Sequence, residues 1–154
     1  MTDYVQQLHR VRRFGERIRA QNRERVSYED DLWSFFQNCW HLKDWLKNDP
    51  SIPTGIRSCV ENDVKAFEAL MICADLANRS KHLLLSNARR DANVAGREIV
   101  VVVTECVGGG SSSNSQTWDY VVTLGDGTTR KALNVADSAI RAWETLLQKH
   151  GLPV

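Results

Sequence analysis

The chain has no long hydrophobic run. No stretch approaches the roughly 18 consecutive apolar residues that a membrane-spanning helix needs, and the N-terminus has no apolar segment of the kind that signal peptides carry. Charge of one sign is also missing, because 20 lysines and arginines stand against 19 acidic residues, which leaves a net charge of +1. We therefore expect a protein without a membrane partner that is not drawn to nucleic acid by its overall charge.

Cysteine is scarce and widely spaced. The four cysteines are Cys39, Cys59, Cys73 and Cys106, with no C-x-x-C pair among them. A structural zinc site usually needs such a pair, and a disulfide framework is typical of a small secreted chain. We predict reduced thiols in a cytoplasmic protein that needs no metal or other cofactor.

Helical periodicity dominates the N-terminal half of the chain. With 154 residues, 42% hydrophobic and 25% charged, the composition is that of one ordinary globular domain. Apolar residues recur with helical spacing over about 3–21 and 27–48. A capping-box pattern at Ser58 opens a third helical segment, which continues to about residue 85. Three antiparallel helices are expected within residues 1–88.

The period changes in the C-terminal part. A β-branched run at 99–103 and alternating residues at 118–124 predict two strands. A tight turn at Gly125–Gly127 and a return strand at 128–133 make a hairpin, and a last helix opens at Asn134. We predict an α+β fold in one domain, residues 1–154: a helical bundle, then a small three-stranded antiparallel sheet and a C-terminal helix in residues 97–154.

The first helix is strongly basic. Residues 1–25 contain seven arginines against three acidic residues, a local charge of +4. Such a helix can lie along a phosphate backbone. The plainer interpretation is a solvated face whose arginines pair with acidic neighbours in the fold.

The third helical segment carries a stripe that turns from apolar to polar. Val60, Val64, Phe67 and Met71 share one face of a helical wheel, and the same face continues as Asp75, Asn78 and His82. If this face is buried, each polar group costs roughly 1–3 kcal/mol when left without a hydrogen bond. We expect these three side chains either to form a satisfied network that fixes helix packing or to serve a site.

A similar polar triplet lies on the second helical segment, where His41, Asp44 and Asn48 share one stripe. A helical hairpin about residues 49–58 places Asp44 opposite about residue 63 and Asn78 opposite about residue 29. The rise of 1.5 Å per residue then separates the two triplets by roughly 20 Å within one chain. A metal site built from His41, Asp44, Asp75 and His82 has suitable ligand types but lacks the register within one chain, whereas a homodimer could bring the two triplets together.

The charged residues beside the stripe have two possible roles. The same register places Arg79 and Lys81 near acidic residues 29–31, where ion pairs would tie the two helices together at roughly 0–1 kcal/mol each. Alternatively, Arg79 and Lys81 hold a phosphate while His82 transfers protons, because the imidazole pKa lies near neutrality.

The segment A-N-R-S-K-H at 77–82 resembles the HEPN motif, R-x4–6-H, often R-N-x-x-x-H. The resemblance implies a small helical-bundle domain that dimerises, many members being metal-independent endoribonucleases of toxin and phage-defence systems. Asn78 and His82 match the motif, and Ala77 stands where the family has its catalytic arginine. The resemblance covers roughly residues 27–85 and does not include the hairpin or the last helix.

These observations lead to one hypothesis and one alternative. The chain is a HEPN-like domain that dimerises through its second and third helices and binds or cleaves RNA. His82 is the acid–base residue, Asn78 orients it, and Arg79 and Lys81 contact the phosphate, with Asp75, His41 and Asp44 as further contacts. The alternative is a non-catalytic dimerisation or protein-interaction module with a structural polar network.

Overall fold

The structure is a computed structural model that describes residues 3–20, 24–83, 100–107, 116–124 and 126–154. Within these ranges it describes the backbone alone at positions 25, 80–83, 100–107 and 116–119.

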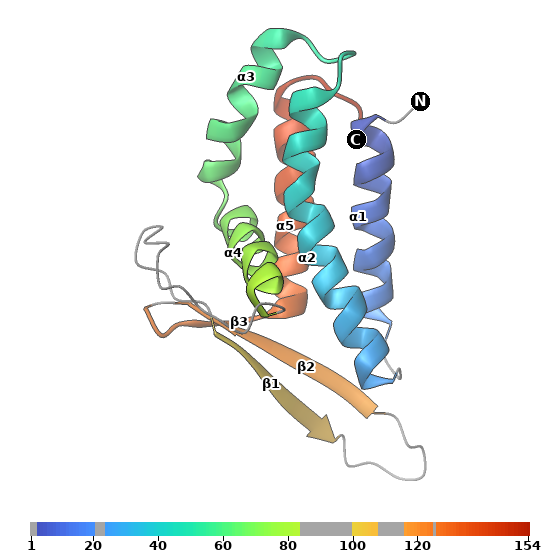
Figure 1. Cartoon of the computed structure of the whole chain (residues 1–154), viewed down its shortest axis with the longest axis vertical. Helices are drawn as coiled ribbons and strands as arrows, with labels where there is room; N and C mark the ends of the chain where they lie inside the picture. The colour runs from blue at the N-terminus through green and yellow to red at the C-terminus, as the bar shows by residue number, and fades with distance from the viewer. Residues whose placement is uncertain (1–2, 21–23, 84–99, 108–115, 125) are drawn as a thin grey trace.

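In the described ranges, five α-helices form the body of the molecule (Figure 1): α1 Tyr4–Arg19, α2 Arg25–Asn48, α3 Thr54–Asp63, α4 Glu68–Leu83 and α5 Ala132–Lys149. The long helix α2 contacts all four others, so it is the element around which the bundle packs. The two chain ends meet at the end of the bundle away from the sheet (Figure 1), where the Tyr4 hydroxyl donates a hydrogen bond to the Pro153 carbonyl at 3.0 Å.

The strands are β1 Val100–Val107, β2 Gln116–Thr123 and β3 Thr129–Lys131, in the antiparallel order β1-β2-β3. The β1–β2 ladder runs from the pair Val100–Thr123 to Val107–Gln116, whereas β3 adds a short edge beside β2. β3 is shorter than the predicted return strand because α5 already begins at Ala132. The mostly helical architecture with an antiparallel sheet agrees with the predicted α+β class.

The hairpin turn between β2 and β3 lies where the glycines predicted it. Gly127 has a φ of +83°, a conformation that favours glycine. The Leu124 N–H donates to the Thr128 carbonyl at 2.8 Å, and Thr128 also donates its N–H and hydroxyl to Asp126. These bonds close the turn.

The predicted starts of three helices are wrong. α2 begins at Arg25 rather than near Ser27, α3 at Thr54 rather than Ser58, and α5 at Ala132 rather than after Asn134. The residues that precede these helices make no side-chain cap. α1, in contrast, has a side-chain cap, in which Asp3 accepts from the Gln6 N–H at 3.0 Å.

The third predicted helix is two helices with a break between them. After α3 the chain makes a 3₁₀ turn at Val64–Ala66, and Phe67 is extended, with φ −113° and ψ 111°. α4 then restarts at Glu68. Because Phe67 is extended, the side chains of α4 do not continue the helical spacing of α3. The stripe drawn through residues 60–82 therefore does not stay on one face.

The core lies between the helices and one face of the sheet. Apolar positions on α1, α2 and α5 are buried, among them Leu8, Phe35 and Trp143. Trp143 is fully enclosed, and its indole N–H donates to the Cys39 carbonyl at 3.1 Å. This bond and the surrounding contacts fasten α5 to α2.

The sheet attaches to the bundle through an aromatic pair. The rings of Tyr28 on α2 and Tyr120 on β2 stack with centroids 5.4 Å apart. The Tyr120 hydroxyl donates to Glu29 Oε1 at 2.8 Å. Because three short strands gain stability by packing on a helix, this contact positions the sheet against the start of α2.

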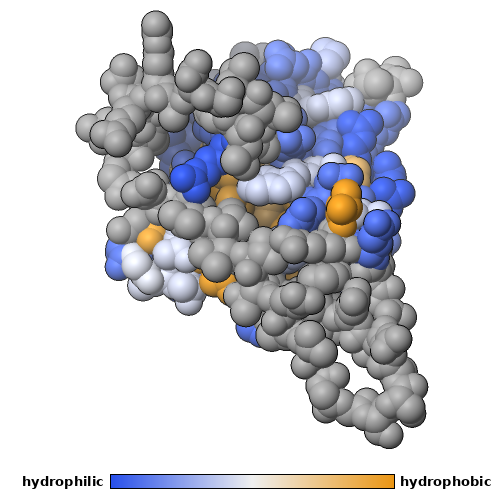
Figure 2. Space-filling model, turned by 60° about the horizontal axis from the view of Figure 1, so that its bottom comes forward, coloured by the Kyte–Doolittle hydropathy of each residue, from blue (hydrophilic) through white to orange (hydrophobic). Residues whose placement is uncertain are grey.

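Among the described residues, no helix is long and apolar enough to span a membrane. The view with the bottom of the molecule brought forward shows a few apolar side chains among mainly hydrophilic ones in the coloured part of the surface (Figure 2). The large apolar residues that the described chain exposes are Val26 and Val154.

Candidate functional site

Asn78 of the polar stripe on α4 faces solvent, contrary to the prediction that the stripe lies on the buried face. Asn78 is exposed and Asp75 is half-buried, whereas Cys73, Leu76 and Ala77 are buried. The extended residue Phe67 explains the difference, because it rotates α4 so that its apolar face, rather than the stripe, meets the bundle. Asn78 is therefore open to a ligand from solvent.

Ala77 occupies the position of the arginine in the resembled motif. Its side chain is 1% exposed and belongs to the packed face of α4. At this position a longer side chain would enter the core, whereas the exposed Asn78 side chain starts about 100° further around the helix axis. A phosphate contact on the outer face must therefore come from other residues of α4. Arg79, which is half-buried, is the next basic residue along the chain.

The remaining residues of the motif lie at the end of α4. The helix continues through Lys81 and His82 to Leu83. The side chains of Lys81 and His82 are outside the described residues, so their predicted roles stay predictions. By helical spacing, a residue four positions after Asn78 lies on the same face, one turn further along.

The triplet on α2 is separate from the stripe on α4, as the hairpin register predicts. Lys47 Nζ lies 2.9 Å from Glu61 Oε2, which sets the end of α2 against α3. Leu32 and Phe36 line one small apolar cavity with Leu76, which sets the other end of α2 against α4. The two polar groups consequently lie at different levels of the bundle.

The described contacts of Asp44 and Asn48 in the α2 triplet are with residues of α2 itself. His41 is half-buried, Asp44 Oδ1 accepts from Lys43 Nζ at 2.7 Å, and the Asn48 amide donates to the Asp44 carbonyl at 2.8 Å. Within the described part of the chain, no group of three or more His, Cys, Asp or Glu side chains is arranged to hold a metal ion.

The acidic residues at the start of α2 have partners on two other elements. Glu29 accepts from Tyr120 of β2, and Asp31 Oδ1 lies 3.4 Å from Arg17 Nη1 of α1. These contacts join α2 to the sheet and to α1. The predicted pairing of this acidic group with Lys81 falls on a side chain outside the described residues.

The arginines of α1 are largely engaged in ion pairs. Arg12 Nη2 lies 2.7 Å from Glu144 Oε1, and Arg19 pairs with Asp137, both acids being on α5. Arg10 lies over the Trp45 ring at 5.7 Å. This arrangement supports the plainer interpretation of the basic helix, in which its charge serves to attach α1 to its neighbours.

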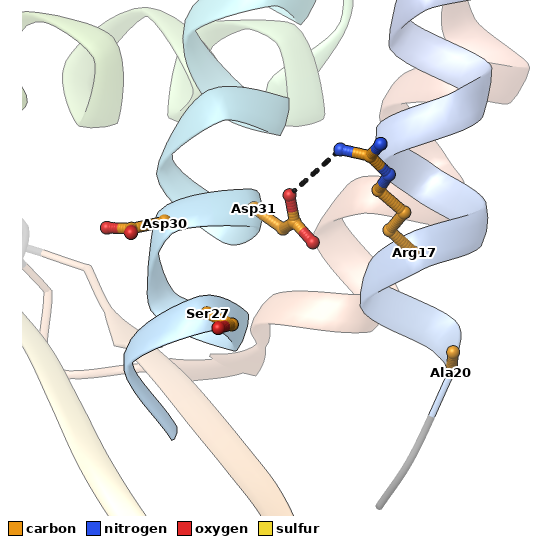
Figure 3. A pocket seen from close by; sticks show the side chains of 5 residues that line it. All are labelled: Arg17, Ala20, Ser27, Asp30 and Asp31. Atoms are coloured by element: carbon orange, nitrogen blue, oxygen red, sulfur yellow. Dashed lines mark hydrogen bonds and ion pairs between the residues drawn. The ribbon is translucent and has the colours of Figure 1, made fainter. Parts of the chain in front are cut away.

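A hollow of about 540 Å³ opens between the end of α1 and the start of α2 (Figure 3). Its lining residues are Arg17, Ala20, Ser27, Asp30 and Asp31. Arg17 points toward Asp31 across the hollow, while Asp30 points away from that pair (Figure 3). Two carboxylates beside one guanidinium make this hollow unsuited to a phosphate.

A second hollow, of about 320 Å³, lies where the first turn of α1 meets the end of α2. Asp3, Tyr4, Asp44, Trp45, Asn48 and Asp49 line it. Asp49 is buried and accepts from the Ser51 hydroxyl at 2.6 Å and from the Tyr4 N–H at 3.1 Å. The Ser51 hydrogen bond is the main cause that lowers the pKa of Asp49, so the carboxylate here anchors the chain.

A cluster that sequence reasoning missed joins α3 to the end of α5. Asp63 Oδ1 accepts from Lys149 Nζ at 2.7 Å, and Asp63 Oδ2 lies 2.6 Å from His150 Nε2. The Asp63 and His150 side chains are each 15% exposed. Because these residues are 87 positions apart, no local spacing could have indicated the contact.

The Asp63 cluster predicts a pH dependence of stability. The Lys149 hydrogen bond, followed by the His150 contact, lowers the pKa of Asp63, so the folded state favours the carboxylate. The resulting stabilisation is present above the pKa of an unfolded aspartate, about 3.9, and is lost as pH falls through the lower folded value. We expect the difference in unfolding free energy between the wild type and Asp63→Asn to shrink on acidification below about pH 4. Urea titrations over this pH range measure it, and a difference that stays constant would contradict the assignment.

Comparison with protein-family models, with curated proteins and with solved structures gave no match for this chain.

Proposed function

We propose that this chain is a HEPN-like RNA-binding domain whose contact site is the outer face of α4 near its C-terminal end. The observation that supports this most is the exposure of Asn78, which directly follows the buried residues Leu76 and Ala77 of the same helix. A site that contacts RNA must be open to solvent, and this condition holds for the residue that matches the motif's asparagine. Half-buried Arg79 lies next to it in the chain.

The chemistry of the residues at this end of α4 suits a phosphodiester. Arginine and lysine at positions 79 and 81 offer positive charge to the phosphate. Asn78 offers an amide that donates and accepts hydrogen bonds. The two hollows between described helices are both lined by carboxylates and would repel the same group. Among these surfaces, the end of α4 therefore fits RNA best.

If the domain cleaves RNA, His82 is the proposed acid–base residue. The imidazole takes the proton of a ribose 2′-hydroxyl, the 2′-oxygen attacks the adjacent phosphorus, and the bond to the 5′-oxygen breaks. The leaving 5′-oxygen takes a proton from water, the imidazolium gives its proton back to the solvent, and the products are a 2′,3′-cyclic phosphate and a free 5′-hydroxyl. Asn78 orients the imidazole from one helical turn away, and Arg79 and Lys81 stabilise the phosphorane-like charge.

The first test measures RNA binding and cleavage with EDTA present. Asn78→Ala and His82→Ala are compared with the wild type, and circular dichroism establishes that each variant is folded. Asn62→Ala is the matched control for the first variant, because Asn62 is an exposed asparagine on the neighbouring helix α3. We expect a loss of affinity of roughly tenfold for Asn78→Ala, equivalent to about 1.4 kcal/mol, and unchanged binding for Asn62→Ala.

The results separate binding from cleavage. Cleavage by the wild type that disappears in a folded His82→Ala variant supports the nuclease mechanism. RNA binding without cleavage supports a binding domain in which the missing arginine at Ala77 has removed the activity. If the wild type neither binds nor cleaves RNA, the proposal is wrong.

The alternative is a non-catalytic interaction module, and the outer part of α2 favours it. Trp33, Trp40 and Trp45 are each half-buried along this helix. Lys43 Nζ lies 4.8 Å from the Trp40 ring centroid. Half-buried tryptophans with polar neighbours are typical of protein–protein contact surfaces. Under this alternative, Trp40→Ala would abolish binding to a protein partner. The wild type would not bind RNA, so no substitution would change RNA binding.

A further inference from the structure

β1 is an edge strand of unusual composition. The order β1-β2-β3 leaves one side of β1 without a neighbouring strand among the described residues. Its sequence V-V-V-V-T-E-C-V contains no proline, glycine or lysine and a single charge, Glu105. Edge strands in stable monomers usually carry proline, lysine or other charged residues. These residues prevent the free N–H and C=O groups of the edge from pairing with another chain.

Among the described elements, no strand lies on the side of β1 away from β2. Figure 1 shows β2 between β1 and the helices, and the main contacts of β1 among described elements are with β2. β3 pairs with residues 121–123 of β2, so the part of the ladder from Thr104–Asp119 to Val107–Gln116 has two strands. A two-stranded ribbon is marginally stable in water, and a further strand would stabilise it.

We propose that β1 pairs antiparallel with β1 of a second copy of this chain, so that the two sheets join into one across a two-fold axis. Antiparallel pairing of a strand with itself is self-complementary and satisfies both free edges at once, which closes the assembly as a dimer. The proposal does not depend on RNA binding by α4, which lies on a different element.

Charge and register favour a second copy as the occupant. The net charge of +1 places little electrostatic cost on self-association. The register that pairs the whole strand sets Val100 opposite Val107 of the second copy and Glu105 opposite Val102 of the second copy. A register that brings the two Glu105 residues together pairs a shorter length and places like charges opposite each other, which is destabilising.

This interface differs from the one that the sequence suggested. The dimer predicted from the sequence uses the second and third helical segments, and it stays a prediction. The β1 edge lies on a different element from those helices.

The test uses sedimentation equilibrium of the full chain over a range of concentrations, with two proline variants, Val102→Pro and Val103→Pro. Consecutive N–H groups of a strand point to opposite sides. One proline therefore removes a donor to β2, and the other removes a donor on the free edge, where proline is tolerated. We expect the wild type to form a dimer of twice 17.5 kDa, and the proline variant that keeps its circular dichroism spectrum to be monomeric. Val102→Ala and Val103→Ala are the matched controls and should remain dimeric.

A second measurement holds even if both proline variants fail to fold. Amide hydrogen exchange of wild-type β1 should show alternate amides protected at low concentration and nearly all protected at high concentration. A wild type that stays monomeric at every concentration overturns the proposal. So does a folded proline variant that still dimerises, or an assembly that grows beyond a dimer.

Discussion

Trp143→Ala should lower the free energy of unfolding by about 3–5 kcal/mol, the range observed when a large buried aromatic side chain is removed. Trp143 is completely buried and joins α5 to α2. Its loss leaves a cavity at that joint and removes the donor to the Cys39 carbonyl. Because a domain of this size is stable by roughly 5–15 kcal/mol, the variant should be close to unfolding. Urea denaturation followed by circular dichroism measures the change.

Two further variants separate the causes of this effect. Trp143→Phe keeps most of the buried ring but not the indole N–H, so it isolates the hydrogen bond and the difference in ring size. Trp40→Ala removes a half-buried tryptophan from the surface of α2 and should cost less than Trp143→Ala. A loss below about 1 kcal/mol for Trp143→Ala would mean that this side chain does not hold the two helices together.

Ala77→Arg should unfold or strongly destabilise the protein rather than restore the complete motif. The change inserts a charged side chain at a position that is 1% exposed, on the face of α4 that packs in the core. An uncompensated buried charge costs about 3–5 kcal/mol, and overpacking adds to it. We expect a fall in thermal stability and no gain of RNA cleavage.

The control for this variant is Ala66→Arg, which places the same side chain at an exposed position just before α4. It should change the unfolding free energy by less than about 0.5 kcal/mol, as is usual on the surface. If Ala77→Arg is as stable as the wild type, the side chain reaches solvent. The family's arginine could then be accommodated, and its absence here would need a functional explanation.

The proposed site shows how one backbone torsion changes the interpretation of a sequence pattern. The stripe from Val60 to His82 predicts buried polar groups only if the helix is continuous. With an extended residue at Phe67, Asn78 becomes exposed and needs no buried partner. The question for this residue is thus what it contacts in solution.

The sequence by itself determined the class of fold and most of its apolar faces. Helical spacing identified α1 and α2 as helices with a buried side, since burial of an amphipathic face is a local periodic property. The turn at Gly127 followed from a backbone conformation that favours glycine. The register of α2 against α3 and α4 followed from helix geometry and the position of the loop between α2 and α3.

Only the tertiary structure decided the break at Phe67, the exposure of Asn78 on α4 and the ion pairs that join distant helices. The segment 64–68 contains no proline or glycine, so local propensity does not mark the break. The contact between Asp63 and His150 and that between Arg12 and Glu144 join residues far apart in the sequence. Such contacts depend on how whole helices pack, a property that no local spacing encodes, and this is why the direction of Asn78 could not be read from the sequence.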